Sequence, residues 1–148
     1  MSNITYIQGD LFELAPINSN LAQACNCQGV WGSGIAVQFR KRFPKSYKNY
    51  VDYCLFYEEL AVGTALVNGR TVSLMTSFDY GKNKDLPDKI IENTRKAISD
   101  LIISYPHIQE IHMPKINAGL FTVPWYDTEE VLLEFDDLLN FVVYELEK

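Results

Sequence analysis

The segment with the richest chemistry is Ala24–Ala36, which reads A-C-N-C-Q-G-V-W-G-S-G-I-A. Its glycines, Gly29, Gly32 and Gly34, allow sharp turns and a close approach of the backbone to a ligand. A helix that begins near Gly34 directs free N–H groups and the positive end of its dipole at one point, which suits a phosphate. The segment is neither a Walker A loop nor a clean G-x-G-x-x-G motif. Its spacing alone leaves two interpretations open, a phosphate site and a plain strand-to-helix turn.

A second loop of small residues lies far along the chain, in Asn117–Phe121. It follows Ile111–Ile116, which has the residues of a buried strand. In α/β sheets, ligands bind outside the carboxyl ends of the strands. If both loops leave such ends on the same edge, they face each other and can hold a diphosphate from two sides.

Acid–base groups are sparse near these loops. Asp79 is the best unpaired acid, and it could activate water or protonate a leaving group. The alternative is a solvated loop carboxylate without a catalytic role. Lys82, Lys84 and Asp85 read as a solvated loop, although a lysine there could fold over a phosphate.

Cysteine and histidine show no metal-binding pattern. Cys25 and Cys27 alternate across the end of a predicted strand, whereas His107 and His112 lie elsewhere in the sequence. Because a zinc site takes four ligands, we expect no metal and no bound cofactor. Packing is the expected role of both thiols, and a nucleophilic Cys27 has no visible base partner.

The elements that must position these residues are alternating strands and helices. An Asn68-Gly69 pair indicates a hairpin, and Asp127 with Glu130 has the spacing of a capping box. The predicted strands are Ile4–Ile7, Leu21–Asn26, Thr64–Val67, Thr71–Thr76, Ile111–Ile116 and Phe141–Leu146. The predicted helices are Gly34–Phe43, Pro44–Tyr57, a helix opening at Pro87, and Pro124–Leu139. Such alternation predicts an α/β fold with a mixed, mostly parallel sheet that is covered on both faces.

The composition bounds the class of protein. The 148 residues fit one domain, residues 1–148, and a hydrophobic fraction of 47% fits a packed core. The net charge of −6 argues against non-specific nucleic-acid binding, which needs a basic surface. We expect no membrane association, because the apolar runs are too short to span a bilayer.

Residues Met1–Thr5 show neither the basic nor the apolar region of a signal peptide. The three cysteines are an odd number and suggest no disulfide framework. We therefore expect a monomer in a reducing compartment, the cytoplasm or the nucleus.

Four motifs resemble those of the macro domain family, the ADP-ribose-binding module. They are Ile4–Phe12, Asn26 with Gly32–Ala36, Met113–Phe121 with Pro124-Trp125 after it, and Phe141–Tyr144. The resemblance covers nearly the whole chain, in the family's order. It implies a three-layer α/β/α fold.

The resemblance also implies which residues hold ADP-ribose. Asp10, with Leu11 beside it, would accept a hydrogen bond from the adenine amino group, the alternative being a turn or helix cap. Tyr144 would stack on adenine or serve as a core aromatic. Asn26 would contact the distal ribose, the alternative being an Asx turn.

The two loops would enclose the diphosphate and the distal ribose, the first mostly through backbone N–H groups. Trp31 is expected to anchor the first loop by packing, the alternative being a lid over the distal end. Phe121 would wall the distal ribose, unless it tucks into the core. Thr76 would face the same edge and contact the substrate. The loop residues implied in substrate binding are Gly32, Ser33, Gly34, Ile35, Asn117, Ala118, Gly119, Leu120 and Phe121.

Within the family, the chain resembles the branch that holds the fungal ADP-ribose 1''-phosphate phosphatase and the terminal ADP-ribose protein glycohydrolase. Three segments fit the phosphatase better: Cys25–Cys27, Trp31-Gly32 and Asn117–Trp125. The glycohydrolase acts through a lysine and an aspartate, and Ser77 and Phe121 stand at those positions. The resemblance thus implies a small-molecule substrate, ADP-ribose 1''-phosphate, whose terminal phosphate is hydrolysed.

Asn26 and Asp79 are the candidate catalytic residues for that hydrolysis. Two alternatives stay open: a hydrolase that removes ADP-ribose from a protein or nucleic acid, and a non-catalytic reader of ADP-ribose or ADP-ribosylated macromolecules.

Overall fold

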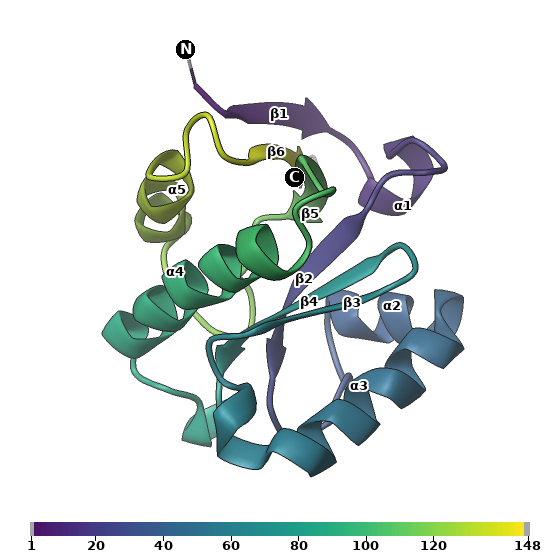
Figure 1. Ribbon diagram of the computed structural model, residues 1–148, viewed down its shortest axis with the longest axis vertical. Helices are drawn as coiled ribbons and strands as arrows, with labels where there is room; N and C mark the ends of the chain where they lie inside the picture. The colour runs from purple at the N-terminus through teal and green to yellow at the C-terminus, as the bar shows by residue number, and fades with distance from the viewer. Residues whose placement is uncertain (1, 147–148) are drawn as a thin grey trace.

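A six-stranded sheet forms the centre of the molecule, with the strand order β1-β6-β5-β2-β4-β3 (Figure 1). The computed structural model describes residues 2–146. Neighbouring strands are parallel except for the antiparallel pair β3–β4, so the predicted mixed, mostly parallel sheet is confirmed. The strands are β1 (Ile4–Gln8), β2 (Leu21–Asn26), β3 (Ala65–Asn68), β4 (Thr71–Ser77), β5 (Glu110–Pro114) and β6 (Asn140–Glu145).

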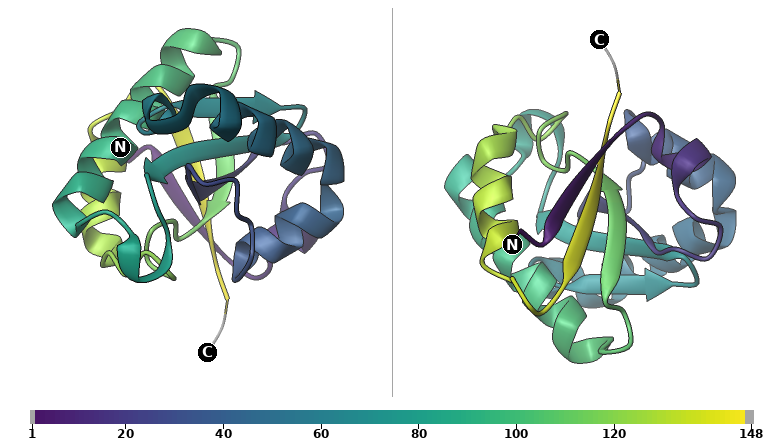
Figure 2. Two further views of the ribbon diagram at one scale, coloured as in Figure 1. Left: turned by 90° about the horizontal axis from the view of Figure 1, so that it is seen from below. Right: turned by 90° about the horizontal axis from the view of Figure 1, so that it is seen from above.

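Helices cover both faces of the sheet, which confirms the three-layer arrangement (Figure 2). One face is covered by α4 and α5, and the other by α1, α2 and α3. The helices are α1 (Leu11–Leu14), α2 (Ile35–Arg42), α3 (Pro44–Tyr57), α4 (Pro87–Ser104) and α5 (Trp125–Leu133). Two short 3₁₀ turns, η1 (Glu58–Ala61) and η2 (Gly81–Asn83), complete the elements.

Alternating side chains along the strands build two cores. In β6, Phe141 and Val143 pack towards α4 and α5, whereas Val142 and Tyr144 pack towards α1–α3. This is the period-two pattern of a strand with both faces covered. The same alternation on β2 and β4 fixes which side chains can reach the carboxyl ends of the strands.

The sheet is interrupted between β2 and β5. The two strands pair at one position, Leu21 opposite His112, and then separate towards their carboxyl ends. β5 ends at Pro114, which has no N–H to donate to a ladder. The predicted strand Ile111–Ile116 was therefore too long by two residues, and these two residues join the loop that borders the opening.

The final helix also ends earlier than the sequence suggests. Residues Pro124–Leu139 were predicted, but α5 ends at Leu133, and Asp137 has a φ of 68°, outside the helical region. The capping-box prediction was wrong as well. Pro124 occupies the N-cap position without a side-chain hydrogen bond, and Asp127 lies within the first turn.

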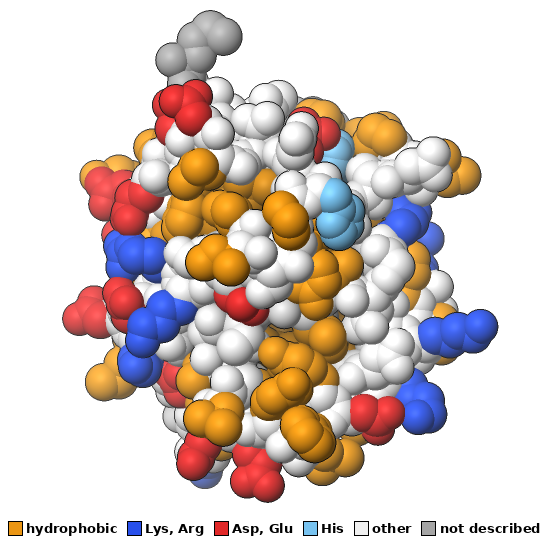
Figure 3. Space-filling model, in the orientation of Figure 1, with side chains coloured by type: hydrophobic (Ala, Val, Ile, Leu, Met, Phe, Trp, Pro, Cys, Tyr) orange, Lys and Arg blue, Asp and Glu red, His pale blue; other side chains and the backbone are white. Residues whose placement is uncertain are grey.

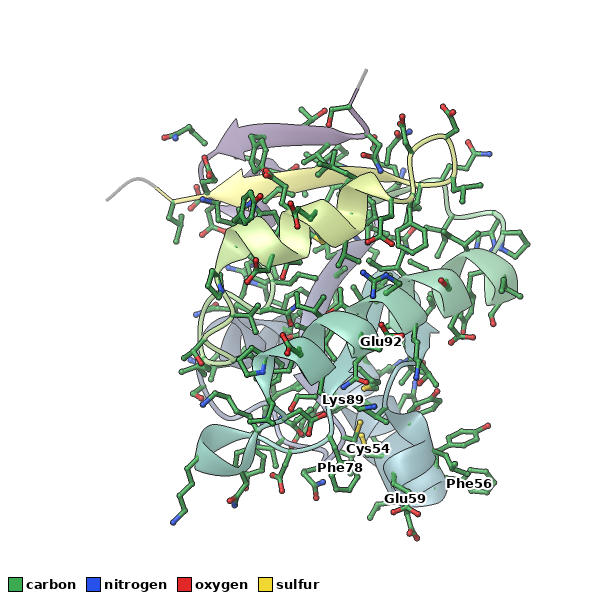
Figure 4. The ribbon with its side chains drawn as sticks, turned by 90° about the vertical axis from the view of Figure 1, so that its left-hand side faces the viewer. Cys54, Phe56, Glu59, Phe78, Lys89 and Glu92 are labelled. Atoms are coloured by element: carbon green, nitrogen blue, oxygen red, sulfur yellow. The ribbon has the colours of Figure 1, made fainter. Side chains whose placement is uncertain are left out.

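Other boundaries follow the sequence closely. The helix predicted at Pro44–Tyr57 is confirmed as α3, with the proline in the first turn. The predicted hairpin is present, but Asn68 pairs with Thr71, so Gly69-Arg70 forms the turn. At the end of α3, Phe56 points away from the molecule (Figure 4).

The surface is mixed in character. On the face drawn in Figure 3, hydrophobic side chains gather near the middle, and Lys and Arg alternate with Asp and Glu along its margins. Among the helices within residues 2–146, none combines the length and the apolar character that a membrane crossing needs.

Candidate functional site

A cavity of about 620 Å³ opens at the carboxyl ends of β5, β2 and β4. This volume is typical of a small-molecule site. Because the cavity lies where β2 and β5 separate, it reaches down between two strands of the sheet. Its walls come from three segments: residues 23–26 with 30–36, residues 114–117 with 119–121, and Tyr80, Gly81 and Lys84.

The first loop, residues 27–34, ends in an open helix N-terminus. Gly34 is the N-cap of α2, with φ 62° and ψ −146°, a conformation that is essentially restricted to glycine. Because glycine has no side-chain cap, the N–H groups of Ile35 and Ala36 stay available at the cavity. These N–H groups and the positive helix end have the arrangement that the predicted phosphate cradle requires, and phosphate binding by them stays a prediction.

Asn26 holds the first loop in shape. Its side-chain oxygen accepts from the N–H groups of Gln28 (2.9 Å) and Val30 (3.4 Å), and its amide donates to the Val30 carbonyl (2.8 Å). The Tyr50 hydroxyl lies 2.6 Å from the backbone oxygen of Asn26 and 2.9 Å from its side-chain oxygen. The Asx-turn interpretation of Asn26 is therefore confirmed. Since a side-chain amide has two N–H donors, the second stays without a partner among the described residues.

Aromatic packing against α3 anchors the same loop on its buried side. Trp31 is 1% exposed and stacks on Tyr50, with ring centroids 4.8 Å apart. The hydroxyl of Tyr47 donates to the Gly29 carbonyl at 3.2 Å. Burial raises the pKa of Tyr50, so its hydroxyl stays protonated and remains a donor. The predicted anchoring role of Trp31 is confirmed.

The second loop, residues 115–123, is held by Asn117. This residue has a φ of 67°, and its side chain points into the core between β4, α4 and α5. Its oxygen accepts from the Thr76 hydroxyl at 2.9 Å, and its amide donates to Thr94 at 3.0 Å and Thr128 at 3.2 Å. Asn117 borders the cavity, but both N–H groups of its side-chain amide already have partners within the protein.

Thr76, which was predicted to contact substrate, is fully buried and is not among the residues that line the cavity. Substrate contact by Thr76 stays a prediction. Its hydroxyl faces Asn117 instead. Thr76 therefore supports the site indirectly, because its hydroxyl holds Asn117, which in turn holds the second loop.

The two loops meet across the cavity. A Cβ placed on Gly34 would lie 3.5 Å from Cδ1 of Leu120, an ordinary van der Waals contact. Gly32, Ser33, Ile35, Gly119 and Phe121 also line the cavity, whereas Ala118 is exposed and lies outside the lining.

The residues predicted at the adenine end lie outside the cavity lining. Asp10 caps α1, with its Oδ1 accepting from the Phe12 N–H at 2.8 Å, and Leu11 is 2% exposed in the core. Tyr144 is 4% exposed, and its hydroxyl lies 2.8 Å from Nδ1 of His112. The cap and the core aromatic are thus what the free protein shows, and adenine recognition by these residues stays a prediction.

Asp79 lies beside the cavity rather than in its wall. Its Oδ1 accepts from the N–H of Tyr80 at 2.8 Å, and its carbonyl accepts from the Ser77 hydroxyl at 2.7 Å. The next residues, Tyr80 and Gly81, do line the cavity. A catalytic role for Asp79 stays a prediction.

The comparisons with known proteins agree with this geometry. The family model described as "Macro domain" matches residues 22–132, which include both loops. This protein is a macro domain. Two relatives carry the name "ADP-ribose 1''-phosphate phosphatase". The one from Candida albicans is 43% identical over 95% of this chain and 98% of its own, and the one from Meyerozyma guilliermondii is 37% identical over 97% and 99%.

Among solved structures, the macrodomain of Mycobacterium tuberculosis DarG is similar, with a TM-score of 0.78 and 26% identity over 95% of this chain and 96% of that one. Asp10 and Tyr144 fall outside the residues matched by the family model. Both loops of this macro domain lie within the matched residues, and adenine recognition by Asp10 and Tyr144 stays a prediction.

Gln23 is a residue of the macro domain's cavity that was not predicted from the sequence. Gln23 lines the cavity floor and is 1% exposed, and neither its amide oxygen nor its amide nitrogen has a hydrogen-bond partner among the described residues. A buried polar group without a partner is destabilising. A polar residue between Ala22 and Ala24 in an apolar strand was the available signal. Gln23 offers a ligand one donor group and one acceptor at the floor.

The charges and thiols in the wall limit what this macro domain can do. Lys115 forms an ion pair with Glu145, with its Nζ 2.5 Å from Oε1. Burial raises the pKa of the Cys25 thiol to about 12, so Cys25 stays a neutral, weak nucleophile. Within residues 2–146, no group of three or more His, Cys, Asp and Glu side chains is arranged to hold a metal ion.

Proposed function

We propose that this macro domain binds ADP-ribose and hydrolyses ADP-ribose 1''-phosphate to ADP-ribose and phosphate. The observation that carries the proposal is the cavity between the two loops, one of which ends in the uncapped N-terminus of α2. Family membership supports ADP-ribose as the ligand. The relatives named for this phosphatase activity align over nearly the whole chain.

In this proposal, the diphosphate lies between the two loops. The N–H groups of Ile35 and Ala36 and the positive end of α2 face its negative charge. Phe121 and Leu120 close the opposite side and exclude water. The second amide N–H of Asn26 is directed to the distal ribose, so the residue that shapes the loop also orients the reacting end.

The chemical step is attack of water on the terminal phosphorus. The water oxygen forms the new P–O bond, the bond from phosphorus to the ribose oxygen breaks, and that oxygen takes up a proton. Cys25 is a neutral thiol and does not serve as the nucleophile. Positioning and backbone electrostatics supply most of the acceleration. Asp79 is the candidate base for the attacking water, because its loop borders the cavity.

The deciding experiment is an assay of purified protein with ADP-ribose 1''-phosphate. We expect release of inorganic phosphate in equal amounts with ADP-ribose, over many turnovers. If ADP-ribose binds in calorimetry but no phosphate is released, a reader or the other hydrolase activity replaces the phosphatase. Release of ADP-ribose from a modified protein or nucleic acid would identify that hydrolase. No binding of ADP-ribose at all would remove the entire proposal.

A lysine-adduct mechanism is not part of this proposal. Ser77 stands where the glycohydrolase of this branch has its lysine, and the Ser77 hydroxyl donates to the Asp79 carbonyl. Phe121, at the position of the aspartate, lines the cavity with an aromatic ring. Removal of ADP-ribose from macromolecules would therefore also depend on water as the nucleophile.

A further inference from the structure

We propose that Lys84 binds the terminal phosphate of the substrate and thereby distinguishes ADP-ribose 1''-phosphate from ADP-ribose. This inference rests on the proposed function, since it assigns a residue to one group of that substrate. It stands on three features of the structure: the order of the strands, the charges in the cavity wall, and the way the loop that carries Lys84 is held.

The strand order gives the ligand a direction. Along the sheet edge, Asp10 follows β1, residues 115–123 follow β5, residues 27–34 follow β2, and residues 78–86 follow β4. With adenine near Asp10 and the diphosphate between the first two loops, an extended ADP-ribose ends beside the loop after β4. Lys84 is the residue of that loop which brings a positive charge to the cavity wall.

The charges in the wall single out the same residue. Among the described residues that line the cavity, the cationic side chains are Lys84 and Lys115. Lys115 is neutralised by Glu145. Among the described residues, the Lys84 ammonium donates to the Gly81 carbonyl alone, at 3.4 Å, which is a weak hydrogen bond. In a chain of net charge −6, this cation is the available counter-charge for a second phosphate group.

The loop that carries Lys84 is fixed at both ends by its neighbour Asp85. The Oδ2 of Asp85 accepts from the N–H of Phe78 and from the amide of Asn93, both at 3.0 Å. The Asp85 N–H donates to the Ser77 hydroxyl at 2.9 Å. Phe78 packs into the core that contains Cys54 (Figure 4). Lys84 is thus presented by a closed loop.

The acidic neighbours leave Lys84 available. The Asp85 carboxylate accepts the hydrogen bonds that close the loop, and the Asp79 carboxylate accepts from the N–H of Tyr80. A lysine ammonium is a compact charge with three donors, which suits a phosphate monoester that carries nearly two negative charges at neutral pH. ADP-ribose lacks this group, so the contact favours the phosphorylated substrate.

The test compares Lys84→Ala with Lys82→Ala. Lys82 lies in the same loop and carries the same charge, but it is exposed and does not line the cavity. For Lys84→Ala we expect kcat/KM for ADP-ribose 1''-phosphate to fall about 10- to 100-fold, the effect of one charge-assisted hydrogen bond. Affinity for ADP-ribose should stay within about twofold. Lys82→Ala should match the wild type, and Lys84→Arg should recover part of the loss.

Inhibition by inorganic phosphate gives a second measure, which does not depend on turnover alone. Phosphate should compete with substrate in the wild type and in Lys82→Ala, and much less in Lys84→Ala. Equal losses in the two alanine variants would overturn the assignment, because they would reflect net charge alone. So would a Lys84→Ala protein with unchanged kcat/KM.

Failure of the proposed function looks different. If the wild type binds ADP-ribose but releases no phosphate, the phosphatase proposal fails, and calorimetry with both ligands then tests Lys84 directly. Tighter binding of ADP-ribose 1''-phosphate that is lost in Lys84→Ala would support the assignment. Equal affinity of the wild type for the two ligands would overturn it.

Discussion

The two loops that face each other across the cavity are both held by a buried asparagine, but in different ways. Asn26 bonds mainly to the backbone of its own loop, two and four residues further on, with Tyr50 as the one distant partner. Asn117 bonds to side chains of β4, α4 and α5, and makes none of these contacts within its own loop. We call each asparagine together with its hydrogen-bond partners a clasp. The Asn26 clasp is mainly local, whereas the Asn117 clasp joins β4, α4 and α5.

This difference indicates which interactions hold each of the two loops in place. The second loop is as rigid as the core that holds Asn117, so damage to this clasp spreads to the whole fold. The first loop depends on a few local bonds and on aromatic packing, so damage there should disturb the site more than the fold. On the first loop, the backbone N–H groups of Ile35 and Ala36 are available at the cavity, whereas Leu120 and Phe121 line it from the second loop.

Asn117→Ala should have the largest effect on stability. It removes three buried hydrogen bonds, worth about 1 kcal/mol each. We expect a loss of about 3 kcal/mol in the free energy of unfolding, measured by urea denaturation. Asn117→Gly relieves the left-handed backbone at this position and should be about 1 kcal/mol less damaging than alanine. A loss below about 1 kcal/mol would show that this clasp does not extend to the core.

Asn26→Ala should reverse the balance between site and fold. We expect turnover of ADP-ribose 1''-phosphate to fall about 10- to 100-fold, because a misplaced loop misaligns the reacting end. Affinity for ADP-ribose should fall less, and stability by about 1–2 kcal/mol. Asn26→Asp keeps the oxygen that accepts from Gln28 but removes both amide N–H groups, so its free energy of unfolding should fall less than that of Asn26→Ala while turnover still falls. An alanine variant with wild-type turnover would contradict the local-clasp interpretation.

Glycine substitutions extend the comparison to the two tips. Gly34→Ala places a side chain at φ 62° and ψ −146°, and should cost about 1–3 kcal/mol and weaken ADP-ribose binding. Gly119→Ala is the control on the opposite loop, because a Cβ there has no atom within 4 Å. It should change stability by less than about 0.5 kcal/mol. Equal effects at the two positions would mean that the backbone of Gly34 is not special.

Asp10→Ala tests whether the two loops alone hold the ligand. If Asp10 accepts from adenine, affinity for ADP-ribose should fall about tenfold in calorimetry, with a loss of about 1 kcal/mol from the helix cap. Asp10→Asn preserves an oxygen for the Phe12 N–H but removes the charge, so it should fold normally and still bind weakly. Unchanged affinity in both variants would remove Asp10 from the site and leave the loops as the binding determinant.

The thiols at the base of the first loop should produce the smallest effect. Burial raises the pKa values of Cys25, Cys27 and Cys54, which lowers their thiolate fractions. With a pKa of about 12, Cys25 is about one part in ten thousand thiolate at pH 8. Iodoacetamide at that pH should leave activity unchanged, and the same treatment in guanidinium should modify all three residues. Rapid inactivation of the native protein would restore a cysteine nucleophile.

Much of the fold could be predicted because its signals are local. Pro44 fits only the first turn of a helix, and the Asn68-Gly69 pair marks a hairpin within one residue. The ends of helices and strands were harder to predict from the sequence. Pro114 ended a strand and Asp137 fell beyond a helix, and in both cases the apolar pattern continued past the true end.

The site was predictable in its backbone but not in its side-chain partners. Glycine spacing identified the first loop, and small residues directly after a predicted strand identified the second. The bond between Thr76 and Asn117 joins residues 41 positions apart, so no local pattern reveals that the threonine turns away from the cavity. Gln23 was visible as a polar residue in an apolar strand, but its exposure to the cavity depends on the separation of β2 from β5.

That separation has a consequence for how long the protein survives. The sheet consists of two three-stranded halves, β1-β6-β5 and β2-β4-β3, which are paired at one position. A ligand that bonds to both loops therefore connects the two halves of the sheet at the edge where β2 and β5 are not paired. Ligand at a thousand times its Kd would add about 4 kcal/mol to the free energy of unfolding. Resistance of this chain to proteolysis would then rise and fall with the supply of its ligand.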